Sequence, residues 1–592
     1  MNILGISCYY HDAAAALLQD GVLVAAAEEE RFSRKKHDSR FPRQAIDFCL
    51  RQAGIKRPDI DYVVFYEKPL IKLERVLLTS LSRFPNSWEV FREATISWFR
   101  GRLWIKGDLI DALGISPQKV LFVDHHLSHA ASAFFCSPFT EAAILTADGV
   151  GEWATATMGT ASADWDGSHS NSIQLSHELR FPHSLGLLYS VFTAFLGFEV
   201  NEGEYKVMGM APYGSPRYLD RIEKVAKVGS DGGVRLNMEY FEYHQSTHRG
   251  FNRRFVALFG EPRSPESDFF TPATHPGVNP GDEAVRRNQY YADVAASIQL
   301  FTEEVMLKMA RELQRTTQQK ALCMAGGVAL NSVANGRIQR ETGFQDIFIQ
   351  PAAGDSGGAV GAALYAWHAL LGNKRRYVME NAYLGEGYTD SQIRDRLTAA
   401  GVQYRAFDDD EKLLQSVTDQ LINGKVIGWF QGRFEWGPRA LGNRSIIADP
   451  RRVEMKEVVN SKIKFREPFR PFAPVVPESS AASLFDGLTH PERSYPLRFM
   501  LLVYPWKQES GQRVPAVNHM GTGRLQTLLR EWNPRYYGLL EYFGQATGTP
   551  VLMNTSFNLR GEPIVSSPED ALNTFRSSGL DSLVLGNCVV GK

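Results

Sequence analysis

A pair of histidines in the first quarter of the chain has the spacing of a shared metal site. His125 and His129 lie four residues apart in VDHHLSHAASAFF. On a helix this spacing places both imidazoles on one face, where they could bind one ion, while His126 points elsewhere. Two helix-surface histidines are the alternative for a pair considered alone. A zinc-protease site is excluded, because no Glu stands beside the first histidine to act as a base.

Two aspartates in other segments could complete this site. Asp148 ends AAILTAD, which reads as a strand, and Asp355 lies in the glycine-rich turn PAAGDSGGA. Small residues after Asp355 would let a helix N-terminus approach a phosphate or metal closely. Two histidines and two aspartates suit Fe(II) or Zn(II), and ligand type alone does not distinguish these ions.

The segments that carry the acidic turns share one pattern. NILGIS is followed by a turn with His11 and Asp12 and then AAAALL, while AAILTAD is followed by GVGE and then WATATMG. Each predicts a strand, an acidic turn and a second strand. This duplication resembles the two halves of the actin, Hsp70 and sugar-kinase fold. Asp12 or His11 could take a proton from an acceptor hydroxyl, with a capping Asp beside a solvated His as the alternative.

Two glycine-bearing turns could approach a nucleotide. NEGEYKVMGMAPYG contains Glu204 and Lys206, and AGGVALN contains Gly326, Gly327 and Asn331. Glycines allow a backbone to come close to a ribose or phosphate, and an Asn amide can bind hydroxyl groups. The alternative is that both turns merely connect elements.

A basic stretch lies in the last third of the chain. From Arg433 to Arg470 there are ten Lys or Arg residues against five Asp or Glu. Such a run is usually a solvated face, but here Phe, Trp, Pro and Gly are interleaved with it, which is more typical of a structured pocket. Guanidinium groups bind phosphate in a bidentate manner, so several of these side chains could converge on a dianion. The candidates are Arg439, Arg444, Lys464 and Arg470, joined further on by Arg524, Asn554 and Ser556.

Several longer motifs resemble one enzyme family. HHLSHA, TADGVGEW and GDSGG in the first part, and RALGNRS, KFREPFRPFAP and NTSFNLRGEPIV in the second, are similar to the O-carbamoyltransferases of antibiotic and nodulation-factor biosynthesis. The resemblance covers the chain to about Val565. It implies an N-terminal domain similar to the tRNA threonylcarbamoyl-adenosine transferase and an α/β, YrdC-like C-terminal domain.

This resemblance implies roles for the candidate residues. The two histidines and two aspartates would bind iron, which contacts a nucleotide phosphate, with zinc as the alternative. The adenylate would contact Gly149, Glu204, Lys206, Gly326, Gly327 and Asn331. Carbamoyl phosphate and ATP, with Mg as an open question, would contact Arg439, Arg444, Lys464, Arg470, Arg524, Asn554 and Ser556.

The implied reaction has two stages. The C-terminal domain would remove phosphate from carbamoyl phosphate and join carbamate to AMP, and the N-terminal domain would transfer the carbamoyl group to a hydroxyl group. The acceptor would be a small natural product of secondary metabolism, such as an amino sugar, a macrolactam or an alkaloid alcohol. Aromatic residues between Phe84 and Trp104, including Trp88, Trp98 and Phe99, could line its pocket or belong to the core, which we favour.

Two other functions remain as alternatives. A threonylcarbamoyl transferase acting on tRNA would use the same fold types, but 65 basic and 66 acidic residues give a net charge of -1 and no general basic face. An ATP-regulated binding module of the actin and Hsp70 kind would leave the histidine pair and the C-terminal arginines unexplained.

Length and composition set the overall organisation. The 592 residues, with 44% hydrophobic and 22% charged, predict two large domains, at 1–372 and 388–592 with a linker at 373–387. Amphipathic patterns predict helices near 43–53 and 294–316. Five scattered cysteines, no evident secretory signal and a polar-interrupted apolar stretch at 181–198 predict a cytoplasmic protein with no membrane or nucleic-acid partner. The oligomeric state stays open, a homodimer being one alternative.

Overall fold

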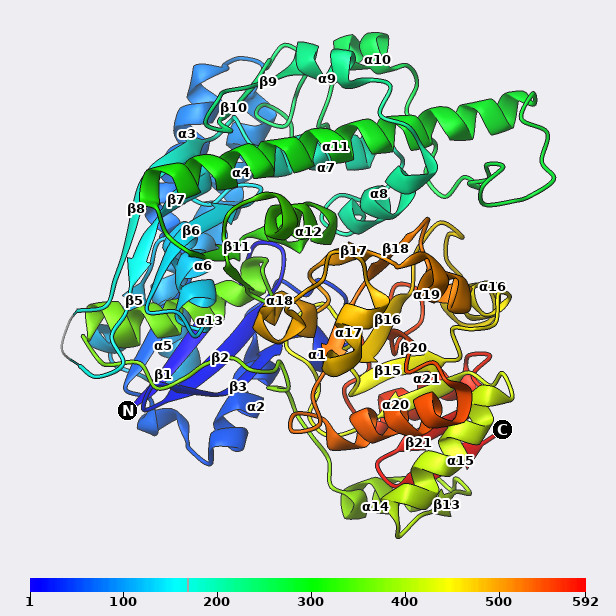
Figure 1. Cartoon of the computed structure of the whole chain (residues 1–592). Coiled ribbons are helices and arrows are strands. Elements are labelled where there is room, and N and C mark those ends of the chain that lie inside the picture. Colours follow the sequence, from blue (N-terminus) through cyan, green and yellow to red (C-terminus); the bar gives the residue numbers. More distant parts are fainter. Residues whose placement is uncertain (168–169) are drawn as a thin grey trace. The chain divides into compact units, whose positions relative to one another are not determined.

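The computed structural model describes residues 1–167 and 170–592 and divides into two compact units (Figure 1). The first unit contains Met1–Val24 and Ser39–Val378, and the second contains Ala25–Asp38 and Met379–Lys592. A short segment from near the N-terminus therefore belongs with the C-terminal part of the chain. The domain ranges 1–372 and 388–592 remain predictions from the sequence, which offered no reason to assign 25–38 separately.

The first unit is built on two five-stranded sheets with the same plan. One has the order β3-β2-β1-β4-β5, and the other has the order β8-β7-β6-β11-β12. In each sheet the central strand pairs antiparallel with its hairpin partner, as β1–β2 and β6–β7, and parallel with a later strand, as β1–β4 and β6–β11. The predicted duplication and the actin-like fold class are therefore confirmed. The strands are Asn2–Ser7 (β1), Ala14–Gln19 (β2), Val22–Glu28 (β3), Tyr62–Phe65 (β4), Val120–Phe122 (β5), Glu141–Ala147 (β6), Ala154–Ser162 (β7), Ser172–Arg180 (β8), Ala321–Ala325 (β11) and Asp346–Ile349 (β12).

Two helices cross each other closely within this unit. Helix α6 (His125–Phe134) packs on β6 and β11, and helix α13 (Asp355–Tyr365) packs on β1, β2 and α6. A Cβ atom at Gly361 would overlap the carbonyl oxygen of Ser128 on α6, and one at Gly5 would overlap the carbonyl oxygen of Ala359. The small residues after Asp355 thus let α13 lie directly against both its sheet and α6.

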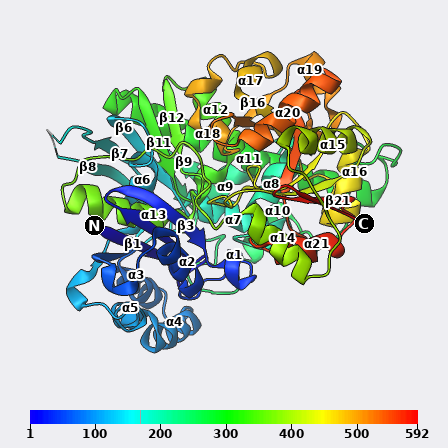
Figure 2. The same ribbon diagram turned by 90° about the horizontal axis from the view of Figure 1, so that it is seen from below.

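The remaining helices of the first unit surround the sheets. Figure 2 shows α3, α4 and α5 grouped beside the first sheet. Helices α2 (Arg43–Ala53) and α11 (Glu283–Thr317) contain the two predicted amphipathic segments. Helix α7 (Leu185–Phe195) is largely buried, and within residues 1–167 and 170–592 no helix has the length and apolar character to cross a bilayer. The others are α3 (Pro69–Ser82), α4 (Trp88–Arg100), α5 (Ile105–Leu113), α8 (Glu204–Met210), α9 (Leu219–Val225), α10 (Arg253–Phe259) and α12 (Ser332–Glu341), with a small hairpin of β9 (Ala226–Val228) and β10 (Val234–Leu236).

The second unit is a mixed α/β structure around an eight-stranded sheet. Its order is β13-β22-β21-β14-β15-β20-β16-β19, with parallel pairs at β14–β21 and β16–β19. The strands are Arg405–Ala406 (β13), Ile427–Phe430 (β14), Arg444–Ala448 (β15), Ala473–Pro477 (β16), Gln526–Leu528 (β19), Leu552–Ser556 (β20), Ser582–Leu585 (β21) and Cys588–Gly591 (β22).

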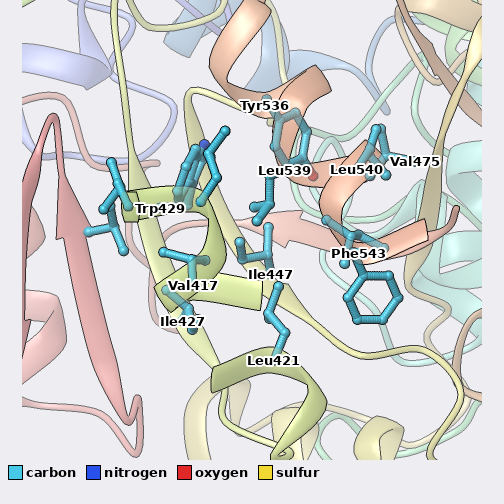
Figure 3. Close-up of a cluster of buried hydrophobic side chains, with 14 of the residues drawn as sticks. Val417, Leu421, Ile427, Trp429, Ile447, Val475, Tyr536, Leu539, Leu540 and Phe543 are labelled. Carbon is cyan, nitrogen blue, oxygen red and sulfur yellow. The ribbon is translucent and has the colours of Figure 1, made fainter. Parts of the chain in front are cut away.

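Apolar side chains between the sheet and two helices form the core of this unit (Figure 3). Helices α15 (Asp410–Ile422) and α20 (Pro534–Thr547) pack against each other and contribute Leu421, Leu539 and Phe543. Trp429 and Ile447 contribute from the strands. The other elements are α1 (Glu30–Ser33), α14 (Asp390–Ala399), α16 (Met455–Val459), α17 (Glu478–Leu484), α18 (Tyr495–Arg498), α19 (Gln508–Arg513), α21 (Pro568–Arg576), β17 (Val503–Pro505) and β18 (Thr522–Arg524).

Candidate functional site

The histidine pair begins helix α6 and is almost completely enclosed. His125 and His129 are each 1% exposed, and their Nε2 atoms lie 3.0 Å apart. The backbone N–H of His125, which has no partner within its own helix, donates to the Glu152 carboxylate at 3.1 Å. His126 bonds instead to Thr146 and to the carbonyl of Ala154, as expected for a ring that points away from the pair.

Both predicted aspartates lie close to the Nε2 atoms of the two histidines. Asp148 follows β6, and its Oδ2 lies 2.9 Å from His125 Nε2 and 3.4 Å from His129 Nε2. Asp355 begins α13, and its Oδ1 lies 3.7 Å and 3.9 Å from the same two nitrogens. One ligand atom from each of the four residues lies within 4.8 Å of all the others. The structure therefore brings together all four residues of the predicted metal set.

The four side chains have the chemistry and spacing of a metal site. Ligands about 2.1 Å from one ion lie about 3.0 to 3.4 Å from their neighbours, close to the separations found here. The Nδ1 atoms of both histidines and Oδ2 of Asp355 are buried without a hydrogen-bond partner. A cation between the four facing atoms would compensate the enclosed carboxylates, and the residues present fit such an ion.

The buried side chains of the cluster shift one another's pKa values, so that protons are bound at the position a cation would occupy. Burial opposes ionisation of Asp148, but hydrogen bonds from both histidines hold its pKa well below the usual value. Burial raises the pKa of Asp355, and the charge of Asp148 adds to this effect. Burial alone would lower the pKa of His125, but its bond to Asp148 and the nearby carboxylates raise it to about 9. Metal binding would displace these protons, because imidazole ligands must be neutral.

The glycine turn AGGVALN lies directly behind Asp148. The backbone N–H of Gly327 donates to Asp148 Oδ1 at 3.0 Å and so orients that carboxylate. Gly326 has a φ of 94°, and a Cβ there would overlap the carbonyl oxygen of Ala147. Gly149 has open space around its Cα, with the nearest atom on Leu187 at 3.9 Å from an added Cβ. These three glycines therefore lie at or beside the candidate metal site.

The other predicted adenylate residues have contacts of their own. The Asn331 side chain accepts from Ala334 N at the start of α12 and exchanges hydrogen bonds with Gln299. Glu204 accepts from the Ser190 hydroxyl at 2.8 Å, and the Lys206 ammonium lies 5.5 Å from the centre of the Phe198 ring. Asn331 thus caps a helix, and Glu204 and Lys206 point to different neighbours.

The first acidic turn contains a hydrogen-bonded pair. His11 Nδ1 lies 2.8 Å from Asp12 Oδ2, and both side chains are about three-quarters buried. Burial would lower the pKa of His11, but the bond and charge of Asp12, with the charges of Asp355 and Glu204, raise it to about 9. His11 is therefore protonated at neutral pH and is held in place by Asp12.

In the second unit, one residue of the predicted anion site is a buried lysine. Lys464 Nζ donates to the Ser556 hydroxyl at 3.2 Å and to the Asn558 side chain at 2.7 Å. Burial holds the pKa of Lys464 well below its usual value, and the charges of Arg466 and Arg470 add to this effect. An anion beside Lys464 would restore its charge, because an opposite charge favours the protonated form.

The predicted arginines do not all have the same surroundings. Arg444 is fully buried in β15, donates to the carbonyls of Gln431 and Asn443, and stacks on Phe430 with its guanidinium carbon 3.6 Å from the ring centre. It organises the surrounding loops. Asn554 bonds to the carbonyl of Ala440, the residue after Arg439, while Arg470 pairs with Glu467 at 3.5 Å. Arg524 ends the short strand β18.

Sequence reasoning missed one acidic residue that shapes the arginine loop. Glu435 is fully buried, and its Oε1 accepts the backbone N–H groups of Leu441, Asn443 and Arg444 at 2.7 to 3.1 Å. The loop that carries Arg439 is thereby closed around a single carboxylate. The only signal in the sequence is an acid amid the basic residues of GRFEWGPRALGNR.

Two models of known protein families match this chain. The model described as "Carbamoyltransferase N-terminus" matches residues 2–364, and the one described as "Carbamoyltransferase C-terminus" matches residues 418–592. The chain belongs to the carbamoyltransferase family. It is accordingly a transferase, as the motifs predicted.

Individual relatives are similar over nearly the whole chain. An uncharacterized protein of Synechocystis is 47% identical over 100% of this chain and 97% of its own length. Nodulation protein NolNO of Sinorhizobium fredii is 35% identical over 99% of this chain and 79% of its own length. Among solved structures, HypF of T. kodakarensis is 15% identical, with a TM-score of 0.30 over 63% of this chain and 48% of that chain.

Proposed function

We propose that this carbamoyltransferase activates carbamoyl phosphate with ATP in its second unit and transfers the carbamoyl group to a hydroxylated natural product in its first. The observation that carries this proposal is that each unit has its own buried constellation. Four atoms of the kind that bind metal ions converge in the first unit, and buried Lys464 is hydrogen-bonded to Ser556 and Asn558 in the second.

In the second unit, Lys464 is the positioned cation. Its ammonium group is held by hydrogen bonds to Ser556 and Asn558, and a bound anion would restore the charge that burial disfavours. Arg439, Arg470 and Arg524 would bind the remaining phosphate oxygens. Carbamoyl phosphate would lose phosphate to water, and a carbamate oxygen would then attack the α-phosphorus of ATP, which forms carbamoyl-adenylate and releases pyrophosphate.

In the first unit, the adenylate would lie near Gly327 and the four ligand side chains. His125, His129, Asp148 and Asp355 would hold an iron or zinc ion, which would supply Lewis-acid stabilisation of a phosphate group. The acceptor oxygen would attack the carbamoyl carbon, and AMP would leave with the electron pair of the broken C–O bond. Because His11 already holds a proton, we assign the acceptance of the hydroxyl proton to Asp12.

Paired variants test the division of labour. Lys464→Ala should abolish pyrophosphate release from ATP and carbamoyl phosphate, while transfer from supplied carbamoyl-adenylate continues. His129→Ala should abolish transfer while pyrophosphate release continues, and this variant should purify without metal. Lys462→Ala and His177→Ala, which remove exposed residues, are the matched controls.

The proposal fails if both partial reactions are lost together in a folded Lys464→Ala protein. It also fails if metal-free His129→Ala still carbamoylates its acceptor. Radiolabel from carbamoyl phosphate that appears on tRNA rather than on a small molecule would favour the threonylcarbamoyl alternative.

A further inference from the structure

Helix α3 has its polar and apolar faces reversed. Within α3, Lys72 is 3% exposed and Arg75 is 8% exposed, whereas Leu70, Leu78 and Leu81 are 70%, 49% and 60% exposed. A helix normally turns its apolar side chains to the interior, since burying a charge is costly unless it is paired. The interior position of the two cations therefore needs an explanation other than the stability of the helix.

Lys72 is compensated by its neighbours. Its Nζ lies 2.5 Å from Glu67 Oε2 and 4.2 Å from the centre of the Tyr10 ring. The charge of this lysine is therefore matched by an acid within the first unit. Glu67 is itself 4% exposed, so the pair is fully enclosed.

Arg75, one turn further along the same face, is influenced by acids only at longer range. Burial lowers the pKa of Arg75, and the charges of Glu67 and Glu152 oppose this. Its guanidinium lies 4.9 Å from the centre of the Phe181 ring, and its Nε is buried without a hydrogen-bond partner. Within residues 1–167 and 170–592, no hydrogen bond or ion pair to Arg75 is found. A guanidinium has five N–H donors, and in Arg75 the donor on Nε is buried and unused, which costs stability.

The two carboxylates that act on the charge of Arg75, Glu67 and Glu152, also contact residues of the candidate metal site. Glu152 accepts the backbone N–H of Lys68, just before α3, at 2.8 Å and that of His125, at the start of α6, at 3.1 Å. Glu67, the partner of Lys72, lies 3.9 Å from His125 Nδ1. The Glu152 carboxylate thus joins the beginnings of α3 and α6. The Glu67 carboxylate lies between Lys72 on α3 and His125 of the candidate metal site.

We infer that Arg75 binds an oxyanion group of the hydroxylated acceptor, which makes an acidic hydroxyl compound the substrate class of the first unit. This inference rests on the proposed function. A planar guanidinium matches a carboxylate or phosphate with two parallel hydrogen bonds, and Phe181 supports its face. An anion held there would fix one end of the acceptor beside the site at which its hydroxyl group reacts.

The test uses the metal-loaded full chain and matched pairs of probes. Lactate, gluconate and 3-hydroxybenzoate are each compared with the neutral amide of the same acid, and binding is followed by ligand-observed NMR. The wild type should prefer at least one acid over its amide. Arg75→Met should weaken binding of that acid about ten- to hundredfold, as expected for loss of charged hydrogen bonds, with little effect on the amide. Arg92→Met, at an exposed position of α4, is the control.

Two further measurements separate the alternatives. AMP binding and metal content should be unchanged in Arg75→Met. The ligand-free variant should melt at the same or a higher temperature, because a largely buried charge without a close ion-pair partner is removed. Loss of AMP binding instead would assign Arg75 to the adenylate phosphate and overturn the inference. A lower melting temperature with loss of metal would show a structural role and also overturn it.

The inference is likewise overturned if the wild type prefers no acid of the panel to its amide, or if the preference survives in Arg75→Met. Its failure is distinguishable from failure of the proposed function. Pyrophosphate release and transfer from carbamoyl-adenylate are measured on the same wild-type protein and do not depend on the choice between acid and amide.

Discussion

The carboxylate of Glu28 accepts a hydrogen bond from the backbone N–H of Gly437 at 3.0 Å, 409 positions further along the chain. Arg31 donates to the carbonyl of the same glycine at 2.6 Å, so both backbone polar groups of Gly437 are bonded to residues from 25–38. Gly437 lies two residues before Arg439. The N-terminal segment therefore helps to shape the candidate anion site of the second unit.

Glu28 should make the stability of the second unit depend on pH. Burial raises the pKa of Glu28 to about 7 from 4.5, with Arg31 opposing this and Glu30 adding to it. Because the folded state binds the proton more tightly, protonation of Glu28 stabilises the folded protein. This stabilisation is complete below pH 4.5 and is lost as the pH rises through 7. A shift of this size corresponds to about 3 kcal/mol.

The comparison with Glu28→Gln measures that contribution. The difference in unfolding free energy between wild type and variant should change by about 3 kcal/mol between pH 4.5 and 8, in favour of the wild type at low pH. Urea titrations followed by tryptophan fluorescence give the two curves. Parallel curves would mean that Glu28 keeps an ordinary pKa in the folded protein.

Arg31 should affect activation and leave transfer intact. Its side chain is 1% exposed, lies 3.7 Å from Glu28 and packs on Phe434. Arg31→Met removes the hydrogen bond to Gly437 and leaves that buried carbonyl without its donor, which costs about 1 to 3 kcal/mol. We expect reduced pyrophosphate release and normal transfer from supplied carbamoyl-adenylate. Lys35→Met, at an exposed position of the same segment, should change neither rate.

Glu435 should be required for the shape of the arginine loop. Its Oε1 accepts three backbone N–H groups, and Glu435→Ala would leave them buried without partners. Each unsatisfied donor costs about 1 to 3 kcal/mol, so the variant should be strongly destabilised. Glu435→Gln retains an oxygen at this position and should recover much of the stability. Chemical denaturation of the three proteins, with the KM for carbamoyl phosphate of the folded ones, provides the measurement.

Local sequence patterns were sufficient for several elements and for the four residues that the structure brings together. Helix α11 and the two acidic-turn halves follow from periodicity, and His125 and His129 share a face because of their spacing. Asp148 and Asp355 were found because each ends or follows a recognisable turn. The parallel and hairpin pairing of the strands then places the turns of Asp148 and Asp355 close together.

The remaining features depend on contacts between distant residues. Arg444 was expected to bind phosphate, but in β15 its guanidinium is surrounded by carbonyl groups. The aromatic residues of helix α4 also differ in a way that local sequence does not predict. Trp98 is buried, as a core residue would be, whereas Trp88 and Phe99 are 53% and 63% exposed. Residues 25–38 carry no pattern that assigns them to the second unit. Only the fold decides which side of an aromatic or basic segment faces the interior.

The close crossing of α6 and α13 should be needed to bring the ligand atoms together. A Cβ at Gly361 would overlap Ser128 O, which lies on α6 between His125 and His129. Gly361→Ala should therefore separate the two helices and move Asp355 away from the histidines. Such overpacking costs about 1 to 3 kcal/mol, and metal retained after dialysis against a weak chelator should fall in parallel.

Gly354→Ala is the matched control for this substitution, because an added Cβ at Gly354 meets no atom within 4 Å and its φ is -72°. It lies next to Asp355 and should leave metal content unchanged. If Gly361→Ala keeps its metal while it loses stability, the helix contact is structural and the ligand atoms tolerate its displacement. If both substitutions lose metal equally, proximity to Asp355 rather than the helix crossing would be responsible.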